Sequence, residues 1–490
     1  MANRSNGKRP NFLVIMSDEH GPMFSSTYGH PLVKTPNMDR LADQAATFNS
    51  AYCNSPLCVP SRLSFMTGRY ASRVRAWDNA TPLASDIITW PYLLRSVGYD
   101  VVLSGKMHFT GLDKLHGFRK QLAFDSHGDV ESDSAEAKQL GISSIGRHPI
   151  YPWREGIPAA FTQWADVKQA GPGSTPMIKA DDEIESAALR YLKESENQPF
   201  ALCVGFVAPH FPFIVPENYF SQYWPDFTDL PEMPLGHIED LPASARRLRR
   251  AFGYDGYTEH EIRRARAAYY GLVTYMDDKI GRLMDTLEEQ GLADNTIIIY
   301  TSDHGESLGE HGLWRKMNFY EQSARVPLQI SWPSEPSISG RRVENHVSLV
   351  DLTVTILDLA GVPVGGRSWE MDGDSLVPLL LGDTCKWKDE VFVEHLAHGT
   401  DHAQAMLRSG PWKICYGHSS PPEIELYNLE SDPGEFLNLA YDPNFQEIRE
   451  DIFRRMMQIW GDPLAITQEV MLGQESRQLI RKVLGDVTLF

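Results

Sequence analysis

The 490-residue chain has few cysteines, no long apolar run and no excess of positive charge, and each absence excludes a class of protein. Five cysteines are too few for this length, and odd in number, to form a disulfide framework, so we expect reduced thiols. No apolar run approaches the ~18 residues that a membrane-spanning helix needs. The net charge of -19 argues against broad binding of nucleic acid or of anionic membranes. Such a chain binds an anion only where it gathers positive side chains locally.

The first 20 residues do not have the pattern of a secretory signal peptide. They are basic, but their apolar run, FLVIM, is short, acidic residues follow it directly, and no small-residue cleavage site is present. We interpret this run as a first strand and predict a cytoplasmic protein. The apolar content of 42% and the charged content of 23% are typical of a globular fold.

Short strand-like runs alternate with amphipathic helical patterns over most of the chain. The predicted strands, which are rich in β-branched residues, cover 11–16, 99–104, 200–207 and 296–302. The predicted helices cover 35–48, 267–291 and 348–362. Residues 110–195 show weak periodicity and are predicted to form long loops. The alternation predicts an α/β fold, with a large, mainly parallel sheet sandwiched by helices.

The pattern changes after about residue 384. Residues 390–396, 403–417 and 423–429 have the pattern of short antiparallel strands with turns, and residues 444–462 have that of a helix. We therefore predict an α/β domain over 1–384 and a smaller α+β subdomain over 385–490. This size suits a large core with an appended domain.

Polar side chains follow each of the four predicted strands. They are Asp18 and Glu19, Lys106 and His108, His210, and Asp303 and His304. One Asp or His after a strand is more often a turn residue or a helix cap. Four such placements at the carboxyl ends of strands, where open α/β sheets bind ligands, indicate a site. Asp18, Asp303 and His304 would suit a divalent cation: carboxylates suit Ca²⁺, Mg²⁺ or Mn²⁺, and the imidazole favours Mn²⁺ or Zn²⁺.

The run C-V-P-S-R at residues 58–62 is the clearest candidate for an anion site. Pro60 and Ser61 fit the start of a helix, and a helix N-terminus attracts anions. Arg62, Lys106 and Lys316 would add fixed positive charge. A divalent cation beside such charges suits the transfer of a phosphoryl or sulfuryl group.

C-V-P-S-R, followed by M-T-G-R, resembles the signature of the type I sulfatase family in the alkaline phosphatase superfamily. G-K-M-H at 105–108, P-H-F-P at 209–212 and S-D-H-G at 302–305 resemble further family motifs in the same order, and ELYNLESDPGEFLNLA resembles its C-terminal hallmark. The Asp303–His304 pair resembles the choline sulfatase and phosphonate monoester hydrolase branches. The resemblance implies an alkaline-phosphatase-like sheet.

The resemblance also implies a cofactor and a metal site. In this family a separate formylglycine-generating enzyme oxidises the signature cysteine, here Cys58, to Cα-formylglycine. One divalent cation, Ca²⁺ or Mn²⁺, would be bound by the modified Cys58, Asp18, Asp303 and His304. Glu19 is a further candidate ligand, although its side chain is longer than the aspartate common at that position.

The remaining roles carried over by resemblance concern the substrate. Arg62 would stabilise the formylglycine and its charge, and His108 would hydrogen-bond its hydrate. Lys106 and Lys316 would contact sulfate oxygens, and His210 would face the leaving-group oxygen. Apart from the resemblance, Asn79 is a further candidate that would either touch the substrate or cap a turn.

The resemblance predicts a sulfuric ester hydrolase of the arylsulfatase or alkyl sulfatase type that acts on a small sulfate ester. A phosphonate monoester or phosphodiester hydrolase with the same machinery, a choline sulfatase and a catalytically idle binding protein are the alternatives. We expect cross-reactivity with phosphonate or phosphate esters, since positioning and charge do most of the work in such transfers. We also expect a homo-oligomer, either a dimer or a tetramer, that binds neither nucleic acid nor membranes.

Overall fold

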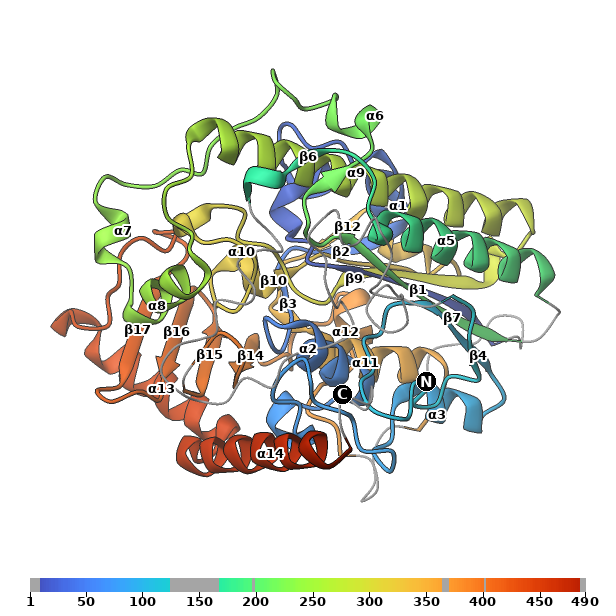
Figure 1. Ribbon diagram of the computed structural model, residues 1–490. Helices are drawn as coiled ribbons and strands as arrows, with labels where there is room; N and C mark the ends of the chain where they lie inside the picture. Colours follow the sequence, from blue (N-terminus) through green and yellow to red (C-terminus); the bar gives the residue numbers. More distant parts are fainter. Residues whose placement is uncertain (1–8, 124–166, 196–198, 364–369, 401, 485–490) are drawn as a thin grey trace.

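The computed structural model describes residues 9–123, 167–195, 199–363, 370–400 and 402–484 (Figure 1). Its centre is an eight-stranded sheet in the order β12-β2-β11-β9-β1-β7-β4-β5, in which β11 alone runs antiparallel to its neighbours. The strands are β1 Asn11–Asp18, β2 Ala45–Phe48, β4 Asp100–Gly105, β5 Lys120–Gln121, β7 Phe200–Pro209, β9 Thr296–Ser302, β11 Leu328–Ser331 and β12 Arg341–Val343. The predicted α/β class and the mainly parallel sheet are confirmed.

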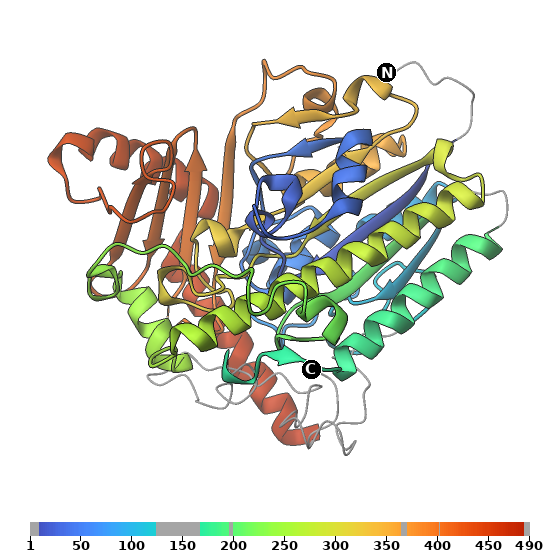
Figure 2. The ribbon, with the colours of Figure 1, turned by 90° about the horizontal axis from the view of Figure 1, so that it is seen from above.

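Helices cover both faces of this sheet (Figures 1 and 2). On one face lie α1 Pro36–Gln44, α5 Pro176–Glu194 and α9 Glu259–Glu289; on the other lie α2 Cys58–Thr67, α3 Trp90–Ser96 and α11 Leu349–Leu359. Side chains of a strand alternate between the two faces. Leu13 and Ile15 of β1 therefore pack in the first core, whereas Phe12 and Val14 pack in the second.

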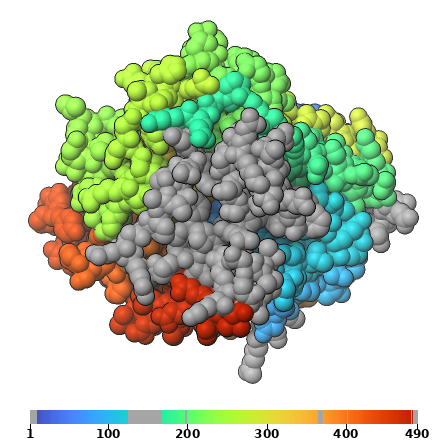
Figure 3. Space-filling model, in the orientation of Figure 1, coloured from blue at the N-terminus to red at the C-terminus, as the bar shows by residue number. Residues whose placement is uncertain are grey.

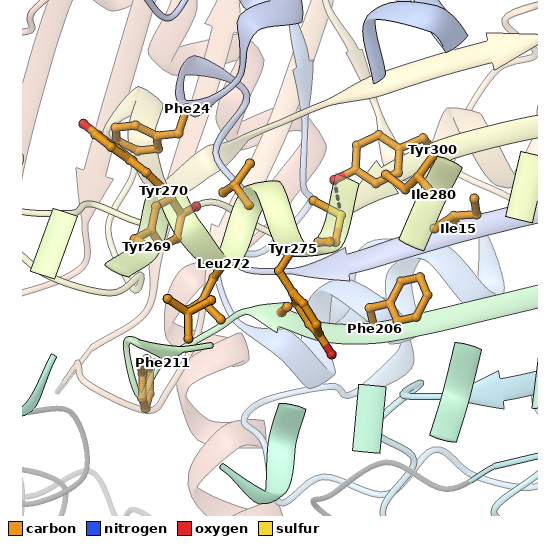
Figure 4. Close-up of a cluster of buried hydrophobic side chains, with 14 of the residues drawn as sticks. Ile15, Phe24, Phe206, Phe211, Tyr269, Tyr270, Leu272, Tyr275, Ile280 and Tyr300 are labelled. Carbon is orange, nitrogen blue, oxygen red and sulfur yellow. Dashed lines mark hydrogen bonds between the residues drawn. The ribbon is translucent and has the colours of Figure 1, made fainter. Parts of the chain in front are cut away.

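Aromatic side chains of α9 fill much of the first core (Figure 4). Tyr275 and Ile280 lie beside the sheet residues Phe206 and Ile15, and Tyr269 packs edge-on against Phe24. At the far side the Tyr300 hydroxyl donates to the Met276 sulfur at 3.2 Å, so its polar end is satisfied inside the core. This packing fixes the strands whose ends carry the candidate site.

Two predicted segments differ in the structure. The helix predicted over 35–48 ends at Gln44, because Ala45–Phe48 pairs as β2 between β11 and β12. The loops predicted over 110–195 contain the 19-residue helix α5. Its apolar stripe, with Ile184, Ala188 and Leu192, is buried against the sheet. Residues 124–166 of the same prediction lie outside the described residues.

A separate four-stranded antiparallel sheet lies beside the main sheet (Figure 1). Its strands are β14 Glu390–His395, β15 Gln404–Ser409, β16 Trp412–Gly417 and β17 Glu423–Asn428, followed by α13 Gln446–Trp460 and α14 Pro463–Leu484. The predicted C-terminal sheet and its helix are therefore present, whereas α14 was not predicted. The domain boundary at 384 stays a prediction.

Shorter elements connect these layers. The strands are β3 Ala51–Tyr52, β6 Gly171–Pro172, β8 Ile214–Val215, β10 Arg325–Val326 and β13 Val347–Ser348; the helices are α6 Glu217–Phe220, α7 His237–Asp240, α8 Ala243–Phe252, α10 Glu321–Ala324 and α12 Val377–Leu380. The buried Lys413 of β16 pairs with Glu321 of α10 at 3.0 Å and with Glu435 at 2.6 Å. This network ties the C-terminal sheet to the main domain.

No helix in the described ranges is long and apolar enough to cross a membrane.

Candidate active site

The four strands with predicted ligands are neighbours in the sheet and end at the same edge. In the order β9-β1-β7-β4, Ser17 pairs with Ser302, Asp18 with Pro209, and Gly105 with Gly205. Gly105 has φ +90, and a Cβ there would lie 2.3 Å from the Gly205 carbonyl oxygen. Only glycine allows the two backbones to approach so closely. The chain turns at Gly105 after β4, and Lys106 is buried at this edge.

The first turn of helix α2 lies at the same edge. It begins at Cys58, two residues before the predicted start, and all ten of its residues are buried. Residues four apart share one face of a helix, so Arg62 lies on the side of Cys58. The Ser61 hydroxyl donates to the Asp303 carbonyl at 2.5 Å and anchors the helix to the end of β9.

Four predicted ligands form one buried group. Single ligand atoms of Asp18, Cys58, Asp303 and His304 lie within 4.8 Å of one another. The Cys58 Sγ is 3.3 Å from the His304 Nε2 and 3.8 Å from the Asp18 Oδ1. The predicted set, drawn from a strand, a helix and the end of a second strand, is therefore brought together.

The chemistry of this group fits a divalent cation. The His304 Nδ1 lies 3.0 Å from the Gly305 carbonyl, which can only accept, so Nδ1 carries the proton and Nε2 presents a lone pair. That lone pair faces carboxylate oxygens of Asp18 and Asp303, each at 3.6 Å. Burial lowers the pKa of His304 and keeps the imidazole neutral. Three acceptors facing one another are stabilised by a shared cation.

Arg62 and Lys106 supply positive charge behind the acids. The Arg62 Nε pairs with the Asp303 Oδ2 at 2.8 Å, and its Nη2 lies 3.4 Å from the Asp18 Oδ2. Lys106 forms an ion pair with Asp18. Burial opposes ionisation of Asp18, but Lys106 and Arg62 outweigh burial and hold the pKa of this carboxyl well below its usual range. Asp18 is therefore ionised, as its predicted role as a metal ligand requires.

Lys316 and His210 form the other side of the site together with Glu19. The Lys316 Nζ is 2.9 Å from the His210 Nε2 and 3.1 Å from the Glu19 Oε1, and the His210 Nε2 is 3.4 Å from the Glu19 Oε2. Burial raises the pKa of Glu19 to about 8 despite Lys316. Glu19 belongs to a second group, with Asp18 and His210, rather than to the four-residue group. Its role as a metal ligand stays a prediction.

An unmodified Cys58 would be a poor nucleophile here. Burial and the Asp18 carboxylate raise the pKa of its thiol to about 12, even with Lys316 and Lys106 nearby. The thiolate is the reactive form of cysteine, and very little forms at neutral pH with such a pKa. The surroundings therefore do not suit direct thiolate chemistry.

The last two predicted residues lie around this centre. Asn79 is buried and its side-chain oxygen accepts from the Val59 N–H at 3.0 Å, directly after Cys58. This bond favours a capping role for Asn79. His108 is buried two residues after Lys106, with φ 61. The role of His108 stays a prediction.

Sequence reasoning missed Glu306, although it follows the Asp303–His304–Gly305 run directly. Glu306 is fully buried, and its Oε1 accepts from the Leu308 N–H at 2.9 Å and from the Arg315 N–H. These bonds close the loop that ends at Lys316. Glu306 therefore positions the lysine on the His210 side of the site.

The reasoning also missed a link from the C-terminal helix to Cys58. Arg477 of α14 pairs with the buried Asp78 at 2.6 Å, and the Gln474 side chain donates to the same carboxylate at 3.1 Å. Asp78 in turn accepts from the Ala80 N–H at 3.0 Å and shapes the turn that presents Asn79. Helix α14 thus supports the segment that holds the N-terminus of α2.

We expect Arg477→Met to lower the free energy of unfolding by ~3 kcal/mol, because it leaves the buried Asp78 charge without its cation. Any catalytic turnover at the candidate site should fall as well, because the turn that presents Asn79 loosens next to Cys58. Denaturant unfolding and steady-state kinetics would measure the two effects. The matched control is Glu475→Gln, which changes one exposed charge on the same helix. Wild-type stability in the Arg477 variant would contradict the proposed support.

Comparison with known proteins gives matches over nearly the whole chain. Residues 10–362 match the family profile Sulfatase, and residues 309–461 match N-sulphoglucosamine sulphohydrolase, C-terminal. The chain is 34% identical to a choline-sulfatase of Rhizobium meliloti (strain 1021), over 97% of this chain and 91% of the relative. It is 29% identical to the multifunctional alkaline phosphatase superfamily protein PehA of Trinickia caryophylli, over 92% and 95%. The phosphonate monoester hydrolase of Agrobacterium radiobacter superposes with a TM-score of 0.75, at 27% identity over 92% and 95%.

Proposed function

The chain belongs to the sulfatase family, and we propose that it hydrolyses a small sulfate ester at the edge formed by Cys58, Asp18, Asp303 and His304. The resemblance of C-V-P-S-R and the other motifs to this family is thereby confirmed. One observation carries the proposal: the four buried ligand atoms lie within 4.8 Å of one another, and three fixed cations surround them. That arrangement supports binding of the anionic sulfuryl group of a sulfate ester by an otherwise acidic protein.

Two groups would complete this site. A divalent cation held by Asp18, Asp303, His304 and the residue at 58 would supply Lewis-acid charge to the sulfuryl oxygens. Ca²⁺ and Mn²⁺ are the candidates, because two carboxylates and one imidazole form the protein's share of the ligands. Conversion of Cys58 to Cα-formylglycine by a formylglycine-generating enzyme would supply a hydroxyl nucleophile in place of the thiol.

The chain's own cations bind and orient the sulfuryl group. Lys106 and Lys316 each present a buried ammonium group, and their partners, Asp18 and Glu19, are acidic side chains at the same edge. Arg62 is engaged more fully, because its Nε, Nη1 and Nη2 contact Asp303, the Lys106 carbonyl and the Ser17 carbonyl. We assign Arg62 to positioning these groups and the lysines to contact with sulfate oxygens.

We assign protonation of the leaving oxygen to His210 and Lys316. The His210 Nδ1 donates to the Phe211 carbonyl at 2.6 Å, so its Nε2 accepts from the Lys316 ammonium at 2.9 Å. Burial disfavours charge on Lys316, but the Cys58, Glu19 and Asp18 groups raise its pKa above the ordinary value. The pair therefore holds a proton beside the departing alkoxide or phenoxide, and His108 is the proposed base at the residue derived from Cys58.

A phosphonate monoester is the second candidate substrate, since one structural neighbour is a phosphonate monoester hydrolase and one relative is named multifunctional. Choline sulfate is a third, from the name of the 34% identical relative. A homo-oligomer and a cytoplasmic location remain predictions.

A substrate panel tests the proposal. The protein would be produced together with a formylglycine-generating enzyme and assayed with 4-nitrophenyl sulfate, choline sulfate and a phenylphosphonate monoester at equal metal concentration. We expect the highest kcat/KM for a sulfate ester and measurable turnover of the phosphonate. A higher kcat/KM for the phosphonate would instead make it the primary substrate. If protein in which Cys58 is fully converted to formylglycine hydrolyses none of the three esters, the proposed catalytic function is refuted.

A further inference from the structure

A cavity of about 390 Å³ lies between α8 and the strands β16 and β17. It is apart from the candidate active site at the carboxyl ends of the main-sheet strands, which is called the sulfatase edge below. Its third side is the segment 317–320, which directly follows Lys316. In Figure 1, α8 lies beside β16 and β17, and in Figure 3 the green residues of this region meet the orange C-terminal residues. The Lys316 side chain reaches Glu19 and His210, so the chain passes from the active site to the cavity within one residue. Ligand sites have volumes of this order.

Three glutamates and two arginines line the cavity, and two of the glutamates are already paired. Glu423 pairs with Arg247 at 2.7 Å, and Glu435 pairs with Lys413 at 2.6 Å. Glu425 accepts from the Tyr427 hydroxyl at 2.8 Å, but within the described ranges no lysine or arginine lies at ion-pair distance from it. Arg250 lines the cavity from an exposed position on α8. The inner wall therefore carries an uncompensated acid.

Burial, with Glu423 and Glu435 nearby, raises the pKa of Glu425 to about 7. A carboxyl in this position gains from a cation that enters the cavity, because the cation replaces the lost hydration of the charged form. The charge inside the cavity thus favours a positively charged ligand over an anion.

Aromatic side chains form much of the remaining wall. They are Phe319, Tyr320 and Tyr427. All three are largely buried, so the surrounding packing holds their rings in place. Aromatic faces attract cations, and a carboxylate beside them adds direct charge; together they recognise ammonium groups with apolar substituents. An inorganic metal ion would find one unpaired carboxylate here, which is too few oxygen ligands.

We propose that this cavity binds a small organic ammonium compound, with its charge against Glu425 and its apolar groups against the tyrosine and phenylalanine rings. The site is separate from the sulfatase edge and does not depend on the proposed catalytic function. Because segment 317–320 connects the two, the bound compound contacts the residues that follow Lys316.

Titration of the full chain with tetramethylammonium chloride, against sodium chloride at equal ionic strength, tests the proposal by calorimetry. We expect saturable binding that Glu425→Gln weakens about tenfold or more, the range of a desolvated cation contact. Glu430→Gln, which removes an exposed charge just after β17, should bind as the wild type does. Phe319→Leu keeps an apolar wall without the ring face and should also weaken binding, which covers the case of a misfolded Glu425 variant.

Three results would overturn the proposal: no saturable binding to the wild type, equal affinity in the Glu425 variant, or displacement of the probe by inorganic sulfate. The last would place the probe at the sulfatase edge. Calorimetry measures binding directly and needs no catalytic turnover, so the test remains valid even if the protein lacks the proposed sulfatase activity. In the other direction, Glu425→Gln should retain turnover of 4-nitrophenyl sulfate.

Discussion

Replacing Cys58 with alanine should abolish hydrolysis of an aryl sulfate while the protein still folds. The residue is small and lies at the first turn of α2, so alanine fits the helix. Removing the precursor of the nucleophile, by contrast, should lower kcat by roughly 10³-fold or more, as losses of catalytic nucleophiles do. Release of inorganic sulfate from 4-nitrophenyl sulfate measures the effect, and mass spectrometry of the peptide around residue 58 reports how much of the wild type is converted.

Cys53→Ala is the matched control for this experiment. Cys53 is equally buried and lies five residues earlier, but it packs in the second core rather than in the ligand group. We expect the control to lose some stability and to keep its turnover. Unchanged sulfate release in the Cys58 variant would refute the assignment of Cys58 as the source of the nucleophile.

Asp18→Asn should produce the second large effect, on metal content as well as on rate. Asp18 belongs to both candidate ligand groups and is also the partner of Lys106 and Arg62. A neutral amide gives the cation weaker ligation and leaves the two positive side chains without their anion. We expect a loss of more than about 100-fold in metal affinity or activity, because changes around a ligand alone cost 10–100-fold.

Metal analysis after dialysis and steady-state kinetics would measure this loss side by side. Asp43→Asn removes an exposed carboxylate from the end of α1 and should change neither quantity. Stoichiometric metal in the Asp18 variant would remove Asp18 from the ligand set. Full metal with low activity would limit its role to holding Lys106 and Arg62.

The strands that carry the site could be predicted because their sequences are locally unambiguous. Each is a short, fully buried, β-branched run, and parallel strands place their carboxyl ends at one edge. Asp18, Asp303 and His304 therefore meet as expected. Helix α5 was missed because its amphipathic stripe is interrupted by charged residues, and β2 was missed because its four residues continue the apolar pattern of α1.

The sequence by itself determined the family, the mainly parallel sheet and the order of residues at its edge, since these follow from local patterns and from the topology of parallel strands. The tertiary structure decided how those residues pair: Glu19 lies with Lys316 and His210, and His304 turns its Nε2 toward two carboxylates. It also decided that Arg477 pairs with Asp78, which lies 399 residues earlier in the chain. Through Asp78, Arg477 supports the turn that presents Asn79 beside Cys58. Such pairings depend on the packing of elements that are distant in sequence, and no local pattern encodes that packing.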